Sequence, residues 1–299
     1  MARVEDKWSA WLLKTRFGGD ADAAERGMRR LYGVRDSVLD KAKISAGETV
    51  LDVGCGDGLI AFGALERVGD RGRVVFCDVS EPLLDRCREA AAAMGATERC
   101  EFILAPADDL SPLDDESVDV VTTRSVLIYV REKARALREF HRVLRAGGRI
   151  SLWEPINRFE MTYGRAADGI TSAIPQIADL LERLQEQIRT LHPHDHPMMD
   201  FDQHDLLRHT EDAGFAAMHL GYHVYVMPAE PMKWGAWVNM AGNPTVPPVG
   251  EIMREIFTAD EMARFEKHFR PALERGGRPV RTAFATVTAT KAAGERDHA

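Results

Sequence analysis

A glycine-rich segment, VLDVGCGDG at residues 50–58, carries the clearest chemical signal in this sequence. It follows a short apolar run and precedes a helical pattern, so the chain must turn sharply between a strand and a helix. Glycine permits such a turn and lets a ligand approach the backbone, because it has no Cβ atom. The N–H groups at the start of the next helix then face that ligand. The segment therefore predicts a binding loop for a nucleotide-like molecule.

The spacing of the glycines separates two kinds of nucleotide site. Gly54, Gly56 and Gly58 form a G-x-G-x-G pattern preceded by Asp52. A dinucleotide fingerprint, G-x-G-x-x-G, would require its third glycine at position 59, where this chain has Leu59. The pattern therefore disfavours an NAD site.

Two acidic positions follow the glycine-rich loop at informative distances. Asp78 ends the second apolar run, roughly 20 residues beyond the glycines, where a carboxylate suits a ribose diol. Asp108 lies in the segment ADDL at residues 107–110, beyond the third run, and its carboxylate can accept from an adenine amino group. Taken singly, Asp78 is as well explained as an exposed strand-end or N-cap aspartate, and Asp108 is better explained as a solvated loop carboxylate. Together with the glycines, they favour an adenosine-containing cofactor.

The order of these motifs resembles that of class I S-adenosylmethionine-dependent methyltransferases. The matching segments are DVGCGDG, CDVS, ADDL and VLRAGGRISLWEP, and they span about residues 44–155. The small-molecule branch carries L-x-P-G-G before its fifth strand, where this chain has Ala146 in place of proline. The resemblance implies S-adenosylmethionine as cofactor. It also implies an α/β, Rossmann-like fold with a seven-stranded, mostly parallel sheet whose last strand is antiparallel.

The resemblance also implies a role for each matching residue. The residues implied to surround the methionine part of the cofactor are Asp52, Gly54, Cys55, Gly56, Gly58, Arg124 and Ser125. Those implied to bind the adenosine part are Asp78, Val79, Ala107 and Asp108. In the first set, Asp52 holds loop N–H groups, or the cofactor's amino group through a water. In the second, Asp78 binds both ribose hydroxyls.

Catalysis of methyl transfer mainly requires that a nucleophile be held in line with the sulfonium methyl group. A general base is needed only if the nucleophile arrives protonated. Two candidates for this role are Glu154, after the fifth strand, and His194, in the segment HPHDHP at residues 192–197. A buried structural carboxylate and an exposed loop histidine are the competing interpretations. No spacing of Cys or His predicts a metal site.

Aromatic residues are candidates for the wall of the substrate pocket. Trp11, Phe17 and Tyr32 lie in the predicted N-terminal helices, and Tyr129 follows the fourth strand. Helix packing onto the core is the alternative role for each of them. No motif in the later segments identifies the substrate.

Composition sets the broad class. The 299 residues include 39 Lys and Arg against 47 Asp and Glu, a net charge of −8, which argues against a nucleic-acid partner. There is no apolar stretch long enough to span a membrane and no signal-like N-terminus. Four cysteines without a paired spacing favour reduced thiols. We therefore expect a cytoplasmic enzyme for a small molecule, as a monomer or homodimer.

Alternating strand and helix patterns predict the elements that must position these residues. Five apolar runs with intervening helices fall within residues 44–155, the predicted cofactor-binding core. The other predicted units are an N-terminal helical cap (1–43), a helical lid insertion (156–215), a core strand (216–228), a second insertion (229–279) and a last strand with the tail (280–299).

Three functions remain open at this point. The first is methyl transfer to oxygen, nitrogen or carbon of a small molecule. The second is an NAD-dependent oxidoreductase, against which Leu59 counts. The third is a protein that keeps the cofactor pocket without transferring methyl groups, because a fold does not fix its chemistry.

Overall fold

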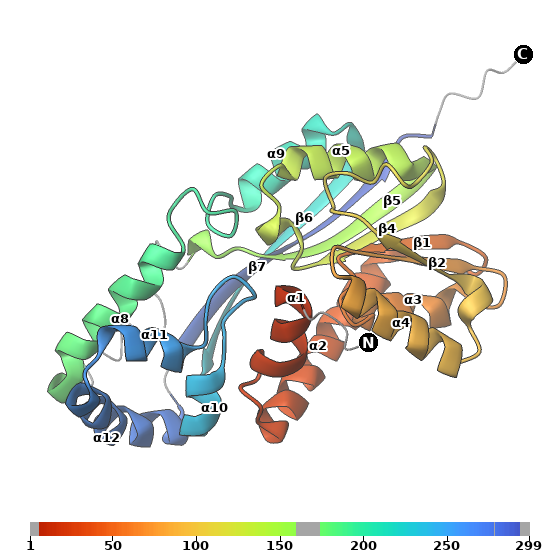
Figure 1. The fold of residues 1–299 in the computed structure, drawn as a ribbon. Coiled ribbons are helices and arrows are strands. Elements are labelled where there is room, and N and C mark those ends of the chain that lie inside the picture. The colour runs from red at the N-terminus through yellow and green to blue at the C-terminus, as the bar shows by residue number, and fades with distance from the viewer. Residues whose placement is uncertain (1–5, 160–173, 278, 294–299) are drawn as a thin grey trace, which may run out of the picture.

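The strands of the described residues form one seven-stranded sheet (Figure 1). The computed structural model describes residues 6–159, 174–277 and 279–293. The sheet order is β3-β2-β1-β4-β5-β7-β6. The strands are β1 (Thr49–Val53), β2 (Arg73–Asp78), β3 (Cys100–Leu104), β4 (Val118–Arg124), β5 (Leu144–Pro155), β6 (Phe215–Pro228) and β7 (Pro279–Lys291). β7 alone runs in the direction opposite to the other six strands, so the predicted fold class is confirmed.

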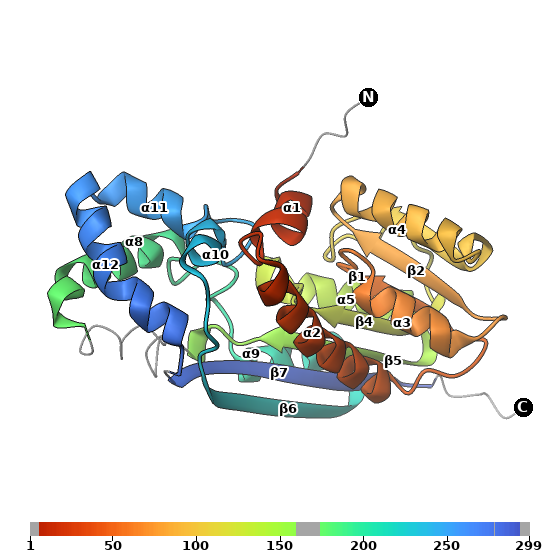
Figure 2. The same ribbon diagram turned by 90° about the horizontal axis from the view of Figure 1, so that it is seen from below.

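Helices cover both faces of this sheet. α2, α3 and α4 pack on one face, around a core that includes Phe76, and α5 and α9 pack on the other face, around Phe140 (Figure 2). β1 and β2 are buried almost throughout, as their continuous apolar sequences require. These helices are α2 (Ala21–Ala42), α3 (Leu59–Val68), α4 (Glu81–Ala93), α5 (Lys133–Val143) and α9 (Gln203–Asp212).

A third hydrophobic core lies beside the sheet and joins helices from both predicted insertions. Phe265 and Phe269 lie at its centre. Its helices are α8 (Ala178–Leu191), α10 (Trp234–Asn239), α11 (Val249–Ile256) and α12 (Ala259–Arg275), with the short turn η4 (Pro175–Ile177). The long strands β6 and β7 extend beneath this group (Figure 2). α8 from the first predicted insertion and α10, α11 and α12 from the second thus form one helical body, whereas α9, expected in the lid, packs on the sheet.

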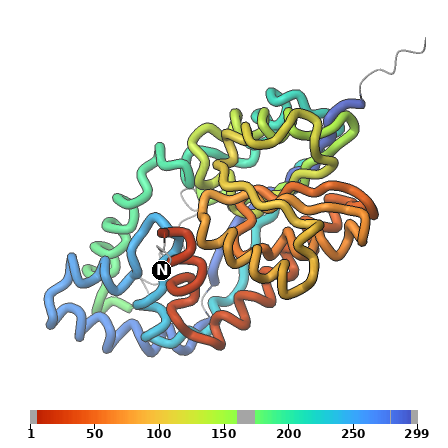
Figure 3. The backbone as a smooth tube through the Cα atoms, turned by 45° about the vertical axis from the view of Figure 1, so that its right-hand side comes forward, coloured from red at the N-terminus to blue at the C-terminus, as the bar shows by residue number. Residues whose placement is uncertain are grey.

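The N-terminal segment lies between this helical body and the core (Figure 3). It consists of α1 (Lys7–Ala10) and the π-helical turn η1 (Trp11–Thr15), followed by α2. Asp20 caps α2 by accepting a hydrogen bond from the Ala23 N–H at 2.8 Å. Asp6 caps α1 in the same way, from the N–H groups of Trp8 and Ser9. These caps fix the direction in which the segment crosses the carboxyl ends of the strands.

Candidate active site

The loop between β1 and α3 can only be built with glycine at key positions. Gly54 has φ +65° and Gly58 has φ +86°, both in the left-handed region. A Cβ atom on Gly54 would lie 2.4 Å from the side chain of Val126, and one on Gly58 would lie 2.4 Å from the ring of Phe62. The loop is therefore packed from behind, and its open side faces a cavity.

Asp78 joins the end of β2 to this loop. Its Oδ2 accepts a hydrogen bond from the Gly56 N–H at 2.8 Å, and its Oδ1 accepts one from the Ser80 N–H at 2.9 Å. The residue is only 7% exposed, and burial raises the pKa of its carboxyl group. Each carboxylate oxygen has a second lone pair free for a donor in the cavity.

The chain reverses after β4 in a turn that Glu154 holds together. Ser125 has φ +58°, which is unusual for a residue with a side chain. The buried carboxylate of Glu154, on β5, accepts hydrogen bonds from the N–H groups of Val126 and Ile128 and from Oγ1 of Thr123. Its burial raises its pKa to about 6. Glu154 therefore positions the short turn η3 (Leu127–Tyr129), which faces the cavity.

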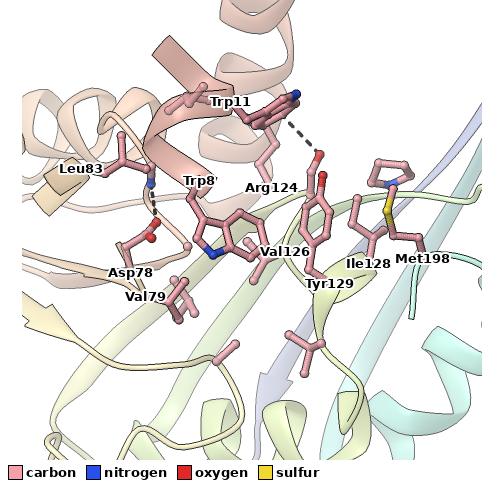
Figure 4. A pocket seen from close by; sticks show the side chains of 18 of the residues that line it. Trp8, Trp11, Asp78, Val79, Leu83, Arg124, Val126, Ile128, Tyr129 and Met198 are labelled. Carbon is pink, nitrogen blue, oxygen red and sulfur yellow. Dashed lines mark hydrogen bonds between the residues drawn. The ribbon is translucent and has the colours of Figure 1, made fainter. Parts of the chain in front are cut away.

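A cavity of about 690 Å³ lies over the glycine loop and the ends of β1, β2 and β4 (Figure 4). This size is typical of small-molecule sites. Its lining includes eleven of the residues selected from the sequence. They are Trp11, Phe17, Gly54, Gly56, Asp78, Val79, Ala107, Asp108, Arg124, Ser125 and Tyr129.

The N-terminal segment forms the roof of this cavity. Trp11 Nε1 donates a hydrogen bond to the Ala241 carbonyl at 3.0 Å, and the Ala241 N–H donates to the Thr15 carbonyl at 3.1 Å. On the other side, the rings of Trp8 and Tyr129 meet edge to face, with centroids 5.0 Å apart. Figure 4 shows Trp8 lying between Val79 and Tyr129. The roof is thus tied both to the second insertion and to the turn after β4.

Six residues selected from the sequence do not line the cavity. Asp52, Cys55 and Gly58 are buried in or beneath the loop, with the Asp52 carboxylate accepting from Thr122 Oγ1 at 2.8 Å. Burial raises the pKa of Asp52 to about 7. These three support the loop from behind.

The other three had been selected for catalysis or substrate contact. Glu154 is fully buried, and its carboxylate is engaged by the turn after β4. His194 is exposed in the loop after α8. Tyr32 is 45% exposed on α2, where the Arg35 guanidinium lies 4.9 Å from its ring centroid. None of the three contributes to the cavity surface in this structure.

Several lining residues have no clear signal in the sequence. Arg16 and Met240 reach the cavity because the N-terminal segment and the second insertion dock there. Met198 belongs to the histidine-rich loop, and it reaches the cavity while His194 points elsewhere on an exposed turn. Ile128 enters from the turn held by Glu154. Their positions depend on tertiary contacts between segments far apart in sequence.

Two kinds of site are absent from the part of the chain that the structure describes. No three His, Cys, Asp or Glu side chains there are grouped so that they can hold a metal ion. No helix in that part combines the length and the apolar composition needed to cross a membrane.

Comparison with known proteins gives consistent matches. Residues 51–152 match the family model described as a methyltransferase domain. The ubiquinone/menaquinone biosynthesis C-methyltransferase UbiE of Escherichia fergusonii is 31% identical over 221 residues, which cover 67% of this chain and 83% of that protein.

Solved structures share the fold at lower identity. A Bacillus halodurans protein assigned as a methyltransferase aligns with a TM-score of 0.53 at 18% identity, covering 86% of this chain and 98% of that one. Geranyl diphosphate C-methyltransferase from Streptomyces coelicolor aligns with a TM-score of 0.50 at 17% identity, covering 87% and 75%. At these identities the two structures support the fold alone.

Proposed function

This chain belongs to the family of S-adenosylmethionine-dependent methyltransferases, and on that premise we propose that the cavity under the N-terminal segment is its active site. The protein is an enzyme that transfers a methyl group from S-adenosylmethionine to a small molecule. An NAD-dependent oxidoreductase and a non-methylating protein are no longer competing interpretations. The proposal concerns which residues hold the cofactor and which kind of acceptor they admit.

The residues at the adenosine end of the cavity fit this cofactor. The observation that carries the assignment is Asp78, a nearly buried carboxylate on the cavity surface with a free lone pair on each oxygen. A ribose supplies two adjacent hydroxyl donors, which match those two lone pairs. Val79 and Ala107 provide apolar contacts for the adenine, and Asp108 accepts from its amino group.

The methionine end of the cavity is formed by the glycine loop and the end of β4. Gly54 and Gly56 bring the backbone close to the ligand, and Arg124 pairs with its carboxylate. Asp52, Cys55 and Gly58 keep the loop in shape from behind, and Ser125 completes the wall. In this assignment the glycines fix where the sulfur lies relative to η3.

When bound, S-adenosylmethionine supplies an electrophilic methyl group on a sulfonium sulfur. The protein's task is to orient the acceptor and to exclude water, for which Trp8, Trp11 and Tyr129 close the cavity. Burial raises the pKa of Tyr129 to about 12, so its hydroxyl keeps its proton and serves as a donor. Among the described lining residues there is no histidine or glutamate to act as a base. We infer that the acceptor reacts without losing a proton to such a side chain in the transition state.

The wall beyond the glycine loop supports an apolar acceptor. It includes Phe17, Ile128, Met198 and Met240, and Figure 4 shows Ile128 and Met198 on the side of the cavity away from Asp78. The relative UbiE is a C-methyltransferase by name, which makes carbon the first acceptor atom to test, with oxygen as the alternative.

The test has two stages. Titration of the purified protein with S-adenosylhomocysteine should give saturable heat in a calorimeter, and failure to bind would contradict the proposal. The protein would then be incubated with ¹³C-methyl-labelled S-adenosylmethionine and a library of apolar small molecules. NMR of the products distinguishes a methyl group on carbon from one on oxygen, and labelling only of amines would reject the proposed acceptor class.

We also propose a cytoplasmic location, a monomeric or homodimeric state and no nucleic-acid partner. The four cysteines are free thiols, as expected in a reducing compartment. The acidic net charge of −8 opposes binding to nucleic acid. Light scattering of the purified protein would give its oligomeric state.

A further inference from the structure

The charged groups that line the cavity are divided between its two ends. Its carboxylates, Asp78 and Asp108, both lie at the end proposed for adenosine. The other end carries three guanidinium groups, those of Arg16, Arg124 and Arg131. Among the described lining residues no carboxylate accompanies them there. The lining of that end is therefore cationic, while the carboxylates of Asp57, Asp52 and Glu154 act on Arg124 from outside the lining.

Two of these guanidinium groups, those of Arg16 and Arg124, are partly buried and form no ion pair with a described carboxylate. Arg16 lies against aromatic rings, with its guanidinium 5.3 Å from the ring centroids of both Trp11 and Phe17. Arg124 makes one contact of 3.4 Å, from Nη1 to Ser125 Oγ. Neither forms an ion pair with any carboxylate that the structure describes. Burying a cation in this way is unfavourable unless an anion completes the site.

The charged groups around Arg16 do not neutralise its guanidinium. The charged groups that face it from neighbouring elements are Arg124 on β4 and Asp57 on the glycine loop, and Asp57 is exposed to solvent. Burial, followed by repulsion from Arg124, lowers the pKa of Arg16 to about 10, so it remains charged at neutral pH. The carboxylate of Asp57 is thus solvated and forms no ion pair with the Arg16 guanidinium.

The cofactor cannot supply enough negative charge to complete this site. S-adenosylmethionine has one carboxylate, which the proposed function places at Arg124, and its sulfonium and ammonium groups add two positive charges. Binding of the cofactor therefore makes the acceptor end more cationic and leaves Arg16 without a counter-ion. The acceptor molecule is the remaining source of an anion.

We propose, resting on the proposed function, that the methyl acceptor is an amphiphilic anion whose carboxylate or phosphate group is held by Arg16, with its apolar body against Phe17, Ile128 and Met240. Arg131, an exposed residue of the cavity lining, attracts the same group as it enters. The arrangement selects against protonated amines, because their charge repeats that of Arg16 and of the sulfonium. It also selects against neutral apolar molecules, which leave the Arg16 charge uncompensated.

Two fluorescent probes of nearly the same shape test the charge requirement. 1-Anilinonaphthalene-8-sulfonate is an anion, and N-phenyl-1-naphthylamine is its neutral counterpart. Each would be titrated into the full-length protein saturated with S-adenosylhomocysteine. The anionic probe should bind at least tenfold more tightly. Equal affinity of the two probes would overturn the proposal.

Displacement of the anionic probe then separates the two sources of the anion. Decanoate, decyl phosphate, decanol and decylamine share an alkyl chain and differ in the head group. Decanoate or decyl phosphate should displace the probe at concentrations at which decanol and decylamine do not, and the better of the two identifies the head group. Displacement by decanol as effective as that by both anions would contradict the proposal.

Variants at Arg16 test whether the preference for the anionic probe depends on this residue. Arg16→Met keeps the apolar stem and removes the charge. It should lower the affinity for the anionic probe roughly 10- to 100-fold and leave the affinity for the neutral probe unchanged. Arg16→Lys should restore part of the affinity. Arg86→Met, on the exposed face of α4, is the matched control and should bind as the unaltered protein does.

The affinity for S-adenosylhomocysteine separates this inference from the proposed function. Arg16→Met should bind it as the unaltered protein does, which also shows that the variant is folded. If Arg16→Met no longer binds S-adenosylhomocysteine but still binds the anionic probe, Arg16 contacts the cofactor and the inference fails. If the unaltered protein binds no S-adenosylhomocysteine at all, the proposed function itself fails.

Discussion

The carboxylate of Asp78 accepts a hydrogen bond from the backbone N–H of Gly56 at 2.8 Å, so one side chain both shapes the glycine loop and faces the cavity. Asp78→Ala removes the acceptor for the ribose hydroxyls and a support of the loop. We expect the dissociation constant for S-adenosylhomocysteine to rise roughly 10- to 100-fold, measured by calorimetry. Asp109→Ala, an exposed carboxylate off the cavity, is the control. Unchanged affinity in Asp78→Ala would remove the basis of the cofactor assignment.

The contact between Trp8 and Tyr129 closes the cavity across the cofactor site. Such an aromatic pair contributes about 0.5–1.5 kcal/mol. Tyr129→Ala should therefore raise the KM for the methyl acceptor by roughly 2- to 10-fold, whereas Tyr129→Phe, which keeps the ring, should change it little. Steady-state kinetics of both variants would check this. If the two variants behave alike, the hydroxyl rather than the ring contact is what matters.

Glu154 should make stability depend on pH in a predictable direction. Burial raises its pKa from 4.5 to about 6, so the folded protein retains a proton that the unfolded chain releases earlier. The stabilisation is complete below the unfolded pKa and is lost as the pH rises through about 6. The difference between the folded and unfolded pKa values of Glu154 corresponds to about 2 kcal/mol in the free energy of unfolding.

The variant Glu154→Gln isolates this effect, because glutamine does not titrate. The free energy of unfolding, measured with urea, should fall between pH 4 and pH 7 in both proteins. The total fall should be smaller in the variant by about 2 kcal/mol. Asp52 and Asp78 titrate in the same sense but are present in both proteins. The amide also presents a donor to the N–H groups of the turn, so kcat/KM should fall. Parallel pH curves for the two proteins would contradict this account.

Lys133 positions the loop that brings Met198 to the cavity. It is 4% exposed, and its Nζ donates to Asp200 Oδ1 at 2.6 Å and to the Pro197 carbonyl at 2.9 Å. Lys133→Met leaves the Asp200 carboxylate unpaired and should lower the free energy of unfolding by roughly 1–3 kcal/mol. The KM for the acceptor should rise, and that for the cofactor should stay the same.

The double variant Lys133→Met with Asp200→Asn is the matched control for Lys133. It removes the unpaired charge, so it should recover much of the stability but not the acceptor KM. Full recovery of both would mean that Lys133 matters for charge balance alone.

Tyr32 and His194 should be dispensable for catalysis, although their residue types made them candidates. Both lie away from the cavity surface. Alanine at either position should leave kcat and KM within roughly twofold of the unaltered enzyme, since exposed substitutions rarely perturb a fold. A tenfold loss at His194 would place the loop after α8 in the reaction after all.

The sequence predicts those parts of the fold that depend on local pattern. The sequence predicts a core strand at residues 216–228 and a last strand within residues 280–299, and the structure has β6 at Phe215–Pro228 and β7 at Pro279–Lys291. Alternation and capping signals are local, so they survive in a single sequence. The glycine spacing is likewise local, because Gly54 and Gly58 are required by backbone conformation and by close packing.

The acceptor side of the cavity could not be predicted in this way. Arg16 and Met240 are separated by more than two hundred residues, and they share a surface only because Trp11 and Ala241 dock together. Tyr32 has the same residue type as Tyr129 but faces outward on α2. Which aromatic residue faces a ligand depends on helix rotation and packing, which composition does not encode.

The position of β7 has a consequence for how the enzyme is made. β7 comes last in the chain but lies between β5 and β6, and β6 pairs with no other strand in the described sheet. A nascent chain that has not yet emerged as far as residue 291 therefore cannot attach β6 to β5. Residues 279–291 must therefore be synthesised before the sheet is continuous from β5 to β6. A chain that stops just before Pro279 would thus lose the strand that joins β6 to β5, and not merely a strand at the edge of the sheet.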